Sequence, residues 1–249
     1  MKYKSIALFL CLCLLVTLYG CKKKEPPPTE PEPDTANMTV LDPAATAVPS
    51  TTNSGTLTLT DSVAYALEGM LYGGITYTNT NASPLSLTEA VFTFTYAGGT
   101  KTETLLAFAP ESDIVMPGET ACAALYVPLG AEENIAGDIS LTVALTGTAA
   151  TASPQRLSVS DAMLTHNYPR FATLTGSLNN PTADICNLNM IYAHFYDDTG
   201  RLLGVWYFSR NAIIQPGDSV PFSVHLSSLP IPGLADNTAS IRFYAYGIS

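Results

Sequence analysis

The chain has 249 residues, of which 13% are charged, and its formal net charge is −10. This negative charge excludes nucleic acid as a partner, because a nucleic-acid-binding surface needs an excess of Lys and Arg. The few charged residues and the absence of long segments with a helical period also argue against a mainly helical protein.

The first 20 residues have the composition of a bacterial export signal. Lys2 and Lys4 precede the apolar segment 6–18, which is shorter than the roughly 20 residues that a membrane-spanning helix needs. The next residues, Leu18-Tyr19-Gly20-Cys21, resemble the lipobox of bacterial lipoproteins. The resemblance implies that residues 1–20 are a lipoprotein signal peptide and that Cys21 is lipidated. An ordinary secretory signal with a chance cysteine is the alternative.

Residues 21–54 are predicted to be a disordered, acidic tether. The segment 25–35 reads EPPPTEPEPDT, in which prolines and acids alternate with few apolar residues. Such a composition favours extended polyproline II structure and cannot form a core. Acyl chains on Cys21 would stabilise membrane binding by about 0.8 kcal/mol for each methylene group buried in the bilayer. We therefore expect a protein that is lipid-anchored on the extracytoplasmic face of the cell membrane.

From residue 55 onward the apolar residues alternate with a period of two, which is typical of half-buried strands. In the segment 85–96, Ala90, Phe92 and Phe94 share one face, which we expect to be buried. Turn residues follow at 97–100 and at Pro117-Gly118. The strands expected in this half are 56–60, 70–78, 85–96, 101–107, 120–127 and 139–147.

The second half of the chain repeats the first. Four pairs of identical residues lie 101 residues apart: Asn79 and Asn180, Leu87 and Leu188, Phe94 and Phe195, and Gly99 and Gly200. The strands expected in this half are 157–164, 171–178, 188–197, 202–208, 220–226 and 239–247. So regular a spacing indicates two copies of one module. The predicted fold is all-β, with two tandem antiparallel immunoglobulin-like β-sandwiches at residues 55–149 and 150–249.

The third strand of each copy resembles the signature of the FxLYD domain, a β-sandwich module of bacterial surface proteins and lipoproteins. In the second copy the signature falls on residues 193–197, AHFYD, where Tyr196 and Asp197 match, Phe195 takes the place of Leu and Ala193 departs from Phe. In the first copy Phe92 matches the Phe of the signature, whereas Thr95 and Tyr96 depart from Tyr-Asp. The resemblance implies the fold and no catalytic residues.

Few residues have the spacing of a catalytic or metal site. Gly217-Asp218-Ser219 is similar to the start of one hydrolase motif, but the first copy has Gly118-Glu119-Thr120 at the same turn. None of the three histidines has another His or a Cys at metal-ligand spacing. We therefore predict a non-enzyme without metal or cofactor. Cys122 and Cys186 are expected to be buried thiols, with a disulfide between the repeats as the alternative.

One set of residues forms a candidate recognition surface. If Phe195 points inward, its neighbours on the strand point outward, and the last strand alternates in the same way. Amphipathic aromatics on a flat sheet face are common at surfaces that bind sugars or peptides. The alternatives are a contact between the two sandwiches and simple strand propensity. The residues are Tyr192, His194, Tyr196, Tyr244 and Tyr246, where the first copy has Val91, Thr93 and Thr95 in its third strand.

The predicted function is a non-catalytic binding or scaffolding module at the cell envelope. Its partners would be the membrane, through the N-terminal lipid, and cell-wall material or another exported protein. One alternative is an envelope hydrolase. Another is a transporter-associated solute-binding lipoprotein, although that class usually has two α/β lobes and the sequence shows no alternation of strands and helices.

Overall fold

Strands with a two-residue period make up most of the described structure. The computed structural model describes residues 51–53, 57–67, 69–107, 113–130, 135, 138–152, 154–167, 171–226 and 233–248. The predicted signal peptide, Cys21 and residues 22–50 of the predicted tether lie outside these ranges. The described residues belong to one compact unit.

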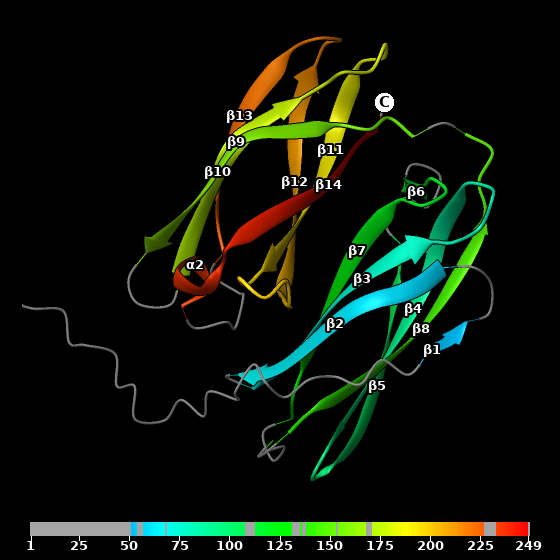
Figure 1. Cartoon of the computed structure of the whole chain (residues 1–249), viewed down its shortest axis with the longest axis vertical. Helices are drawn as coiled ribbons and strands as arrows, with labels where there is room; N and C mark the ends of the chain where they lie inside the picture. Colours follow the sequence, from blue (N-terminus) through cyan, green and yellow to red (C-terminus); the bar gives the residue numbers. More distant parts are fainter. Residues whose placement is uncertain are drawn as a thin grey trace, which may run out of the picture. The chain divides into compact units, whose positions relative to one another are not determined.

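The first repeat is a sandwich of two sheets (Figure 1). One sheet has the order β2-β3-β7, and the other has the order β1-β8-β4-β5, with β6 pairing to β4. The short strand β1 falls within the predicted tether and pairs with β8 in parallel, whereas the other named pairs are antiparallel. The strands are β1 (Thr51–Asn53), β2 (Leu57–Leu67), β3 (Met70–Asn79), β4 (Leu85–Tyr96), β5 (Gly99–Leu106), β6 (Ile114–Val115), β7 (Thr120–Pro128) and β8 (Ser140–Ala149).

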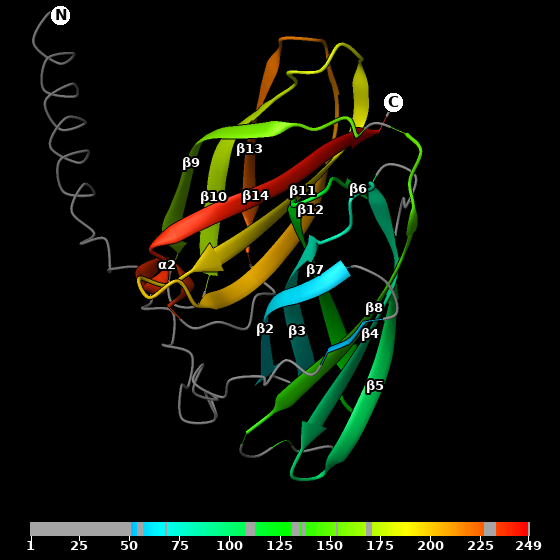
Figure 2. The same ribbon diagram turned by 45° about the vertical axis from the view of Figure 1, so that its right-hand side comes forward.

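The second repeat has the same topology. Its sheets have the orders β9-β10-β13 and β12-β11-β14, so β9 to β13 take the places of β2, β3, β4, β5 and β7, and β14 that of β8. Figure 2 shows the two sheets of each repeat from a second direction. The elements are β9 (Ser158–Asn167), β10 (Phe171–Asn179), β11 (Cys186–Tyr196), β12 (Leu202–Ile214), β13 (Ser219–His225), a short helix α2 (Leu234–Asn237) and β14 (Ser240–Ile248). The chain is therefore all-β, with two tandem β-sandwiches, as the sequence predicts.

The interior of the first sandwich is built from the residues that alternation predicts. Ala90, Phe92 and Phe94 of β4 are fully buried. Gly73 of β3 lies opposite them, and a Cβ at this position would be 2.9 Å from atoms of both phenyl rings. A side chain there would therefore push the two sheets apart, which explains a glycine in the middle of a buried strand.

A buried asparagine lies at the end of an equivalent strand in each repeat, Asn79 as the last residue of β3 and Asn180 directly after β10. The side-chain amide of Asn79 donates to the carbonyls of Ser83 and Val115 at 2.9 and 2.8 Å. Asn180 donates to Asp184 and Ile214 at 2.8 and 2.9 Å. Each asparagine thus ties its strand to the following loop and to a strand end of the other sheet. The repeated Asn in the sequence marks this conserved geometry between the two copies.

No helix in the described part of the chain combines the length and the apolar character needed to cross a membrane.

Candidate functional site at the interface between the repeats

The two repeats pack against each other through the sheets β2-β3-β7 and β12-β11-β14. Strand β12 is an edge strand, so it carries backbone groups that no neighbouring strand pairs. The Tyr65 hydroxyl donates to the Leu203 carbonyl at 2.8 Å, and the Tyr72 hydroxyl donates to the Val205 carbonyl at 2.7 Å. The Tyr72 oxygen also accepts from the Val205 N–H at 2.6 Å. Hydroxyls of the first repeat therefore satisfy the free edge of the second.

The predicted recognition surface lies in this interface. Its alternation is as expected, because Phe195 faces the interior of its own sandwich and the five predicted residues occupy the other face. That face is not open to solvent: His194, Tyr196, Tyr244 and Tyr246 are at most 5% exposed, and Tyr192 is half-buried. The expectation of an outward-facing surface is corrected by the packing of the first repeat on it.

The environment of His194 reflects this burial. Its Nδ1 lies 3.0 Å from the Tyr196 hydroxyl, and the Arg242 guanidinium lies 4.7 Å from the centre of the Tyr196 ring. Burial, assisted by the nearby Arg242 charge, lowers the pKa of His194 to about 4. The imidazole is therefore neutral at physiological pH and acts as a packed polar group.

A second polar group in the interface is the carboxyl of Asp113. It precedes β6 of the first repeat and accepts a hydrogen bond from the Tyr244 hydroxyl at 2.6 Å. Burial raises its pKa to about 6, against the opposing effects of the Tyr244 hydrogen bond and of Arg156. Arg156, from the connection between the repeats, stacks 4.3 Å from the centre of the Tyr244 ring and bonds Glu119 at 2.6 Å.

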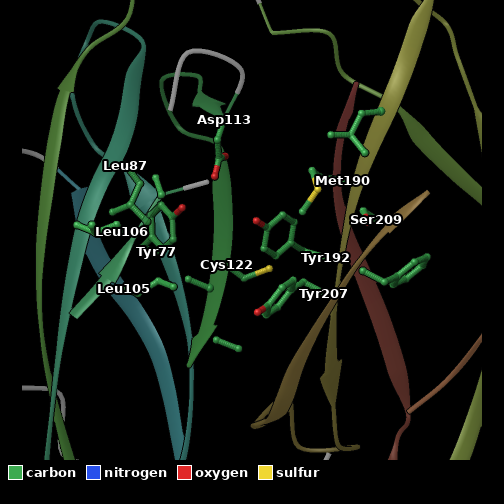
Figure 3. Close-up of a pocket in the computed structure, with 15 residues that line it drawn as sticks. Tyr77, Leu87, Leu105, Leu106, Asp113, Cys122, Met190, Tyr192, Tyr207 and Ser209 are labelled. Atoms are coloured by element: carbon green, nitrogen blue, oxygen red, sulfur yellow. The ribbon is translucent and has the colours of Figure 1, made fainter. Parts of the chain in front are cut away.

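A cavity of ≈ 560 Å³ lies beside these groups. Its walls come from β3, β4, β5 and β7 of the first repeat and from β11 and β12 of the second. Figure 3 shows Tyr77, Leu87, Leu105 and Leu106 on one side of Cys122, with side chains of the second repeat on the other side. The cavity therefore occupies the open side of the first sandwich, between its edge strands β5 and β7, where the second repeat covers it.

The wall of the cavity is mainly apolar but includes a few polar groups. Tyr77 is fully buried, and its hydroxyl has no hydrogen-bond partner among the residues that the structure describes. Asp113 lies in the same part of the wall (Figure 3), and burial followed by the Asp113 charge raises the pKa of Tyr77. Burial also raises the pKa of the Cys122 thiol, so this sulfur is a protonated, unreactive part of the wall.

Sequence reasoning missed most of this site. Of the predicted surface residues, only Tyr192 lines the cavity. Tyr77 and Leu87 look like ordinary core residues in a strand pattern, and Asp113 looks like a loop acid. Their convergence depends on how two sheets from different repeats meet, and neither strand period nor the repeat contains that information.

The motifs that resemble catalytic or metal sites have local structural roles. The Ser219 hydroxyl bonds the Asn179 amide oxygen at 2.6 Å, and an amide oxygen cannot serve as a general base. Asp197 accepts from the Thr199 N–H at 3.0 Å within a hairpin. Within the described residues no three His, Cys, Asp or Glu side chains are grouped as metal ligands. Cys122 and Cys186 are both buried free thiols, which contradicts the alternative of a disulfide between the repeats.

The comparisons with known proteins add little to this geometry. No protein-family model matches the chain, and the search of curated proteins found no match. A solved β-glucuronidase of Bacteroides uniformis is 13% identical over 64% of this chain and 21% of its own, with a TM-score of 0.19. A red sea bream transglutaminase is 9% identical over 69% of this chain and 27% of its own, with a TM-score of 0.21. The chain thus spans about a quarter or less of these structures, and likeness at this level carries no argument about activity.

Proposed function

We propose that the chain is an envelope lipoprotein, anchored through Cys21, whose two sandwiches act together as one non-catalytic binding module. The observation that carries this proposal is the buried interface itself. Tyrosine hydroxyls of one repeat satisfy backbone groups of the other, and Asp113 and Tyr244 bond across it. Such an interface holds the two sandwiches in one fixed arrangement. A fixed arrangement suits a module that presents a binding site better than two sandwiches joined by a flexible linker would.

The location rests on the N-terminal sequence. A positively charged start, an apolar segment and the residues LYGC precede a proline-rich acidic segment. This order suits export, lipidation at Cys21 and a spacer between the bilayer and the first sandwich. The partners that fit are the membrane, through the lipid, and cell-wall material or another exported protein.

The anchor is tested by expressing the full chain in a bacterial host and analysing the mature N-terminal peptide by mass spectrometry. The expected peptide begins at Cys21 and carries the mass of diacylglycerol, and the Cys21→Ala variant loses both the lipid and membrane fractionation. A wild-type peptide that begins elsewhere and carries no lipid would overturn the anchor.

The non-catalytic role is tested with purified cell-wall sacculi. We expect the full chain to leave the sacculi intact, with no soluble fragments released above a boiled-protein control. If the wild-type chain released soluble fragments and a single substitution abolished this release, the result would instead support the hydrolase alternative.

A further inference from the structure

The open edge of β12, the side that faces away from β11, continues beyond the residues that the first repeat satisfies. The N–H and the carbonyl of Val205 both bond the Tyr72 hydroxyl, so they point to this edge. The pairing of β11 with β12 is regular over residues 204–211, and in an antiparallel pair every second residue directs its backbone groups to the same side. Tyr207 and Ser209 therefore also turn an N–H and a carbonyl to the open edge. Within the described part of the chain no group bonds these four.

Most of the other sheet edges carry a feature that hinders pairing with a further strand, such as a short strand, a charged side chain, a proline or a bulge. Strand β1 has three residues, β5 carries Lys101, β13 contains Pro221, and β2 and β9 each have a register shift. The edge of β14 is covered by the connection between the repeats, because the Leu157 N–H bonds the Ala245 carbonyl. Strand β12 is the longest of the described strands, with 13 residues, and it has no Lys or Pro and one charged residue, Arg210. Its open edge is therefore suited to pairing with a further strand.

The cavity between the repeats lies beside this part of β12. Tyr207, Phe208 and Ser209 line it, and its volume of ≈ 560 Å³ falls within the roughly 300–1,000 Å³ of ligand sites. Tyr207 is 43% exposed, and Leu106 of the same wall is 68% exposed, so the cavity opens to solvent at these residues. The β7 side of the wall consists of small residues, the Cys and two Ala at 122–124, which leave room beside the edge (Figure 3).

An extended peptide matches both the edge and the cavity. Its backbone offers an N–H and a carbonyl at every second residue, which is the spacing of Tyr207 and Ser209, and its side chains alternate in direction with the same period. The side chains of one face would therefore lie against the wall of the cavity. Asp113 is the only carboxylate or cation among the described residues of that wall, so apolar side chains fit it best.

Two other occupants fit less well. A glycan has hydroxyls for the edge of β12, but most of the wall is apolar, as at Leu105, Leu188 and Met190, and offers the remaining hydroxyls no partner. A second copy of this chain would bring a whole sandwich to the edge. Strands β2, β3 and β7 of the first repeat already pack against β12, and they restrict the approach of so large a body.

We propose that the open edge of β12 at Tyr207 and Ser209 binds an extended peptide segment of another exported protein. The peptide adds a strand to the sheet β12-β11-β14 and places every second side chain, an apolar one, in the cavity. This inference rests on the proposed role as a binding module and specifies the partner as a polypeptide. It does not depend on the lipid anchor.

The test uses the full chain in lipid nanodiscs and the fluorescein-labelled peptide SVSLSVS, in which apolar residues alternate with serine. We expect saturable binding of one peptide per chain above the signal of empty nanodiscs. Ser209→Pro removes the N–H at the open edge and keeps the pairing with β11, because that N–H points away from β11. Affinity for the peptide should fall at least about tenfold, the equivalent of one hydrogen bond.

Two variants are matched controls. Ser209→Ala removes the side chain and keeps the N–H, so it should bind the peptide as the wild type does. Thr104→Pro makes the same kind of change at the open edge of β5. The Ala107 N–H bonds the Thr88 carbonyl, and the regular pairing of β4 with β5 therefore points the Thr104 N–H away from β4. Because Thr104 does not line the cavity, this variant should also bind as the wild type does.

Hydrogen exchange of the wild-type chain, resolved to single amides, provides a second readout that needs no variant. The peptide should slow exchange at Tyr207 and Ser209, because it bonds their N–H groups, and it should leave exchange at Thr104 unchanged. If Ser209→Pro does not fold, this measurement decides alone.

The proposal is overturned if saturable binding is absent, or if Ser209→Pro and Thr104→Pro bind the peptide equally. It is also overturned if the peptide slows exchange at Thr104 and not at Tyr207 and Ser209. A dimer of the chain that slows exchange at these two amides without peptide would show that a second copy occupies the edge, which contradicts the proposal as well. If the chain binds sacculi and does not bind the peptide, this inference fails and the role as a binding module stands.

Discussion

The two repeats share one topology but use opposite sheets to meet each other. The first repeat contributes the outer face of β2-β3-β7, and the second contributes the outer face of β12-β11-β14. Tyr72 lies in the interface, and the equivalent residue of the second repeat is Thr173, on a polar face. Conversely, His194 is 3% exposed, whereas its equivalent Thr93 bonds Thr102 across an exposed pair at 3.1 Å.

This reciprocal difference shows what the two copies have in common and what they do not. Some residues that hold the sandwich together, such as Asn79 and Asn180, are the same in both. Residues on the outer faces differ according to what covers them, because strand preferences depend mainly on packing and burial.

The largest effect is expected at the shared asparagines. Asn180→Ala leaves the buried carbonyl of Ile214 without its donor and removes one of the donors to the Asp184 carbonyl. It also leaves the Thr182 N–H without its acceptor. An unsatisfied buried group costs about 1–3 kcal/mol, so we expect a loss of about 3 kcal/mol in the free energy of unfolding. Urea denaturation followed by circular dichroism measures it.

The same change in the first repeat tests whether the two asparagines are equivalent. Asn79→Ala should cost nearly as much as Asn180→Ala, since the two amides have equivalent partners. Asn81→Ala is the control, because the Asn81 side chain bonds only the exposed Ala82 N–H at 3.1 Å among the contacts seen here. It should cost less than about 1 kcal/mol. Equal losses for Asn81 and Asn79 would contradict a special role of the repeated asparagine.

The sequence predicts the shared part of the molecule well and the interface poorly. Alternation places Ala90, Phe92 and Phe94 inside, and the repeat marks Asn79 and Asn180. The sequence also shows the difference between Thr93 and His194, and contact between the two sandwiches is one of the interpretations that it allows. The sequence does not determine which sheet covers the tyrosines, because a half-buried strand has the same pattern whether water, a ligand or another sheet lies on its second face.

The interface should also change the dependence of stability on pH. The pKa of Asp113 is raised by burial to about 6, so its contribution to stability is greatest below pH ~4 and is lost as the pH rises to about 6. The pKa of His194 is lowered to about 4, so its contribution is present above pH ~6.5 and is lost as the pH falls. The two contributions oppose each other between pH 4 and 6.

Variants of one residue at a time should reveal the opposing contributions of Asp113 and His194 to the pH dependence of stability. In Asp113→Asn only the histidine remains, and stability should rise by up to about 3 kcal/mol from pH 4 to 6.5. In His194→Gln only the carboxyl remains, and stability should fall by a similar amount from pH 4 to 6. Urea midpoints across this range provide the measurement. Parallel pH profiles for both variants would contradict burial of the two groups in one interface.

A smaller effect is expected from the hydroxyl that satisfies the edge of β12. Tyr72→Phe removes the partner of both the carbonyl and the N–H of Val205, which we expect to cost about 2 kcal/mol. Tyr126→Phe removes from the same face a hydroxyl that has no partner within the described part of the chain and should be neutral or slightly stabilising. A neutral Tyr72→Phe would mean that water replaces this hydroxyl, and therefore that the two sheets do not form a dry contact.

The smallest effect should come from the free face of the first repeat. Thr93→Val removes an exposed cross-strand hydrogen bond to Thr102 and keeps a β-branched side chain, so the free energy of unfolding should change by less than about 0.5 kcal/mol. The equivalent His194→Val leaves the Tyr196 hydroxyl without its partner in a buried position and should cost more than about 1 kcal/mol. The two positions are equivalent, because β4 and β11 occupy the same place in their sandwiches, but His194→Val also removes a larger side chain from a buried position. If Thr93→Val cost as much as His194→Val, the outer face of β4 would be covered as well, and the distinction between an internal and a free face would have to be abandoned.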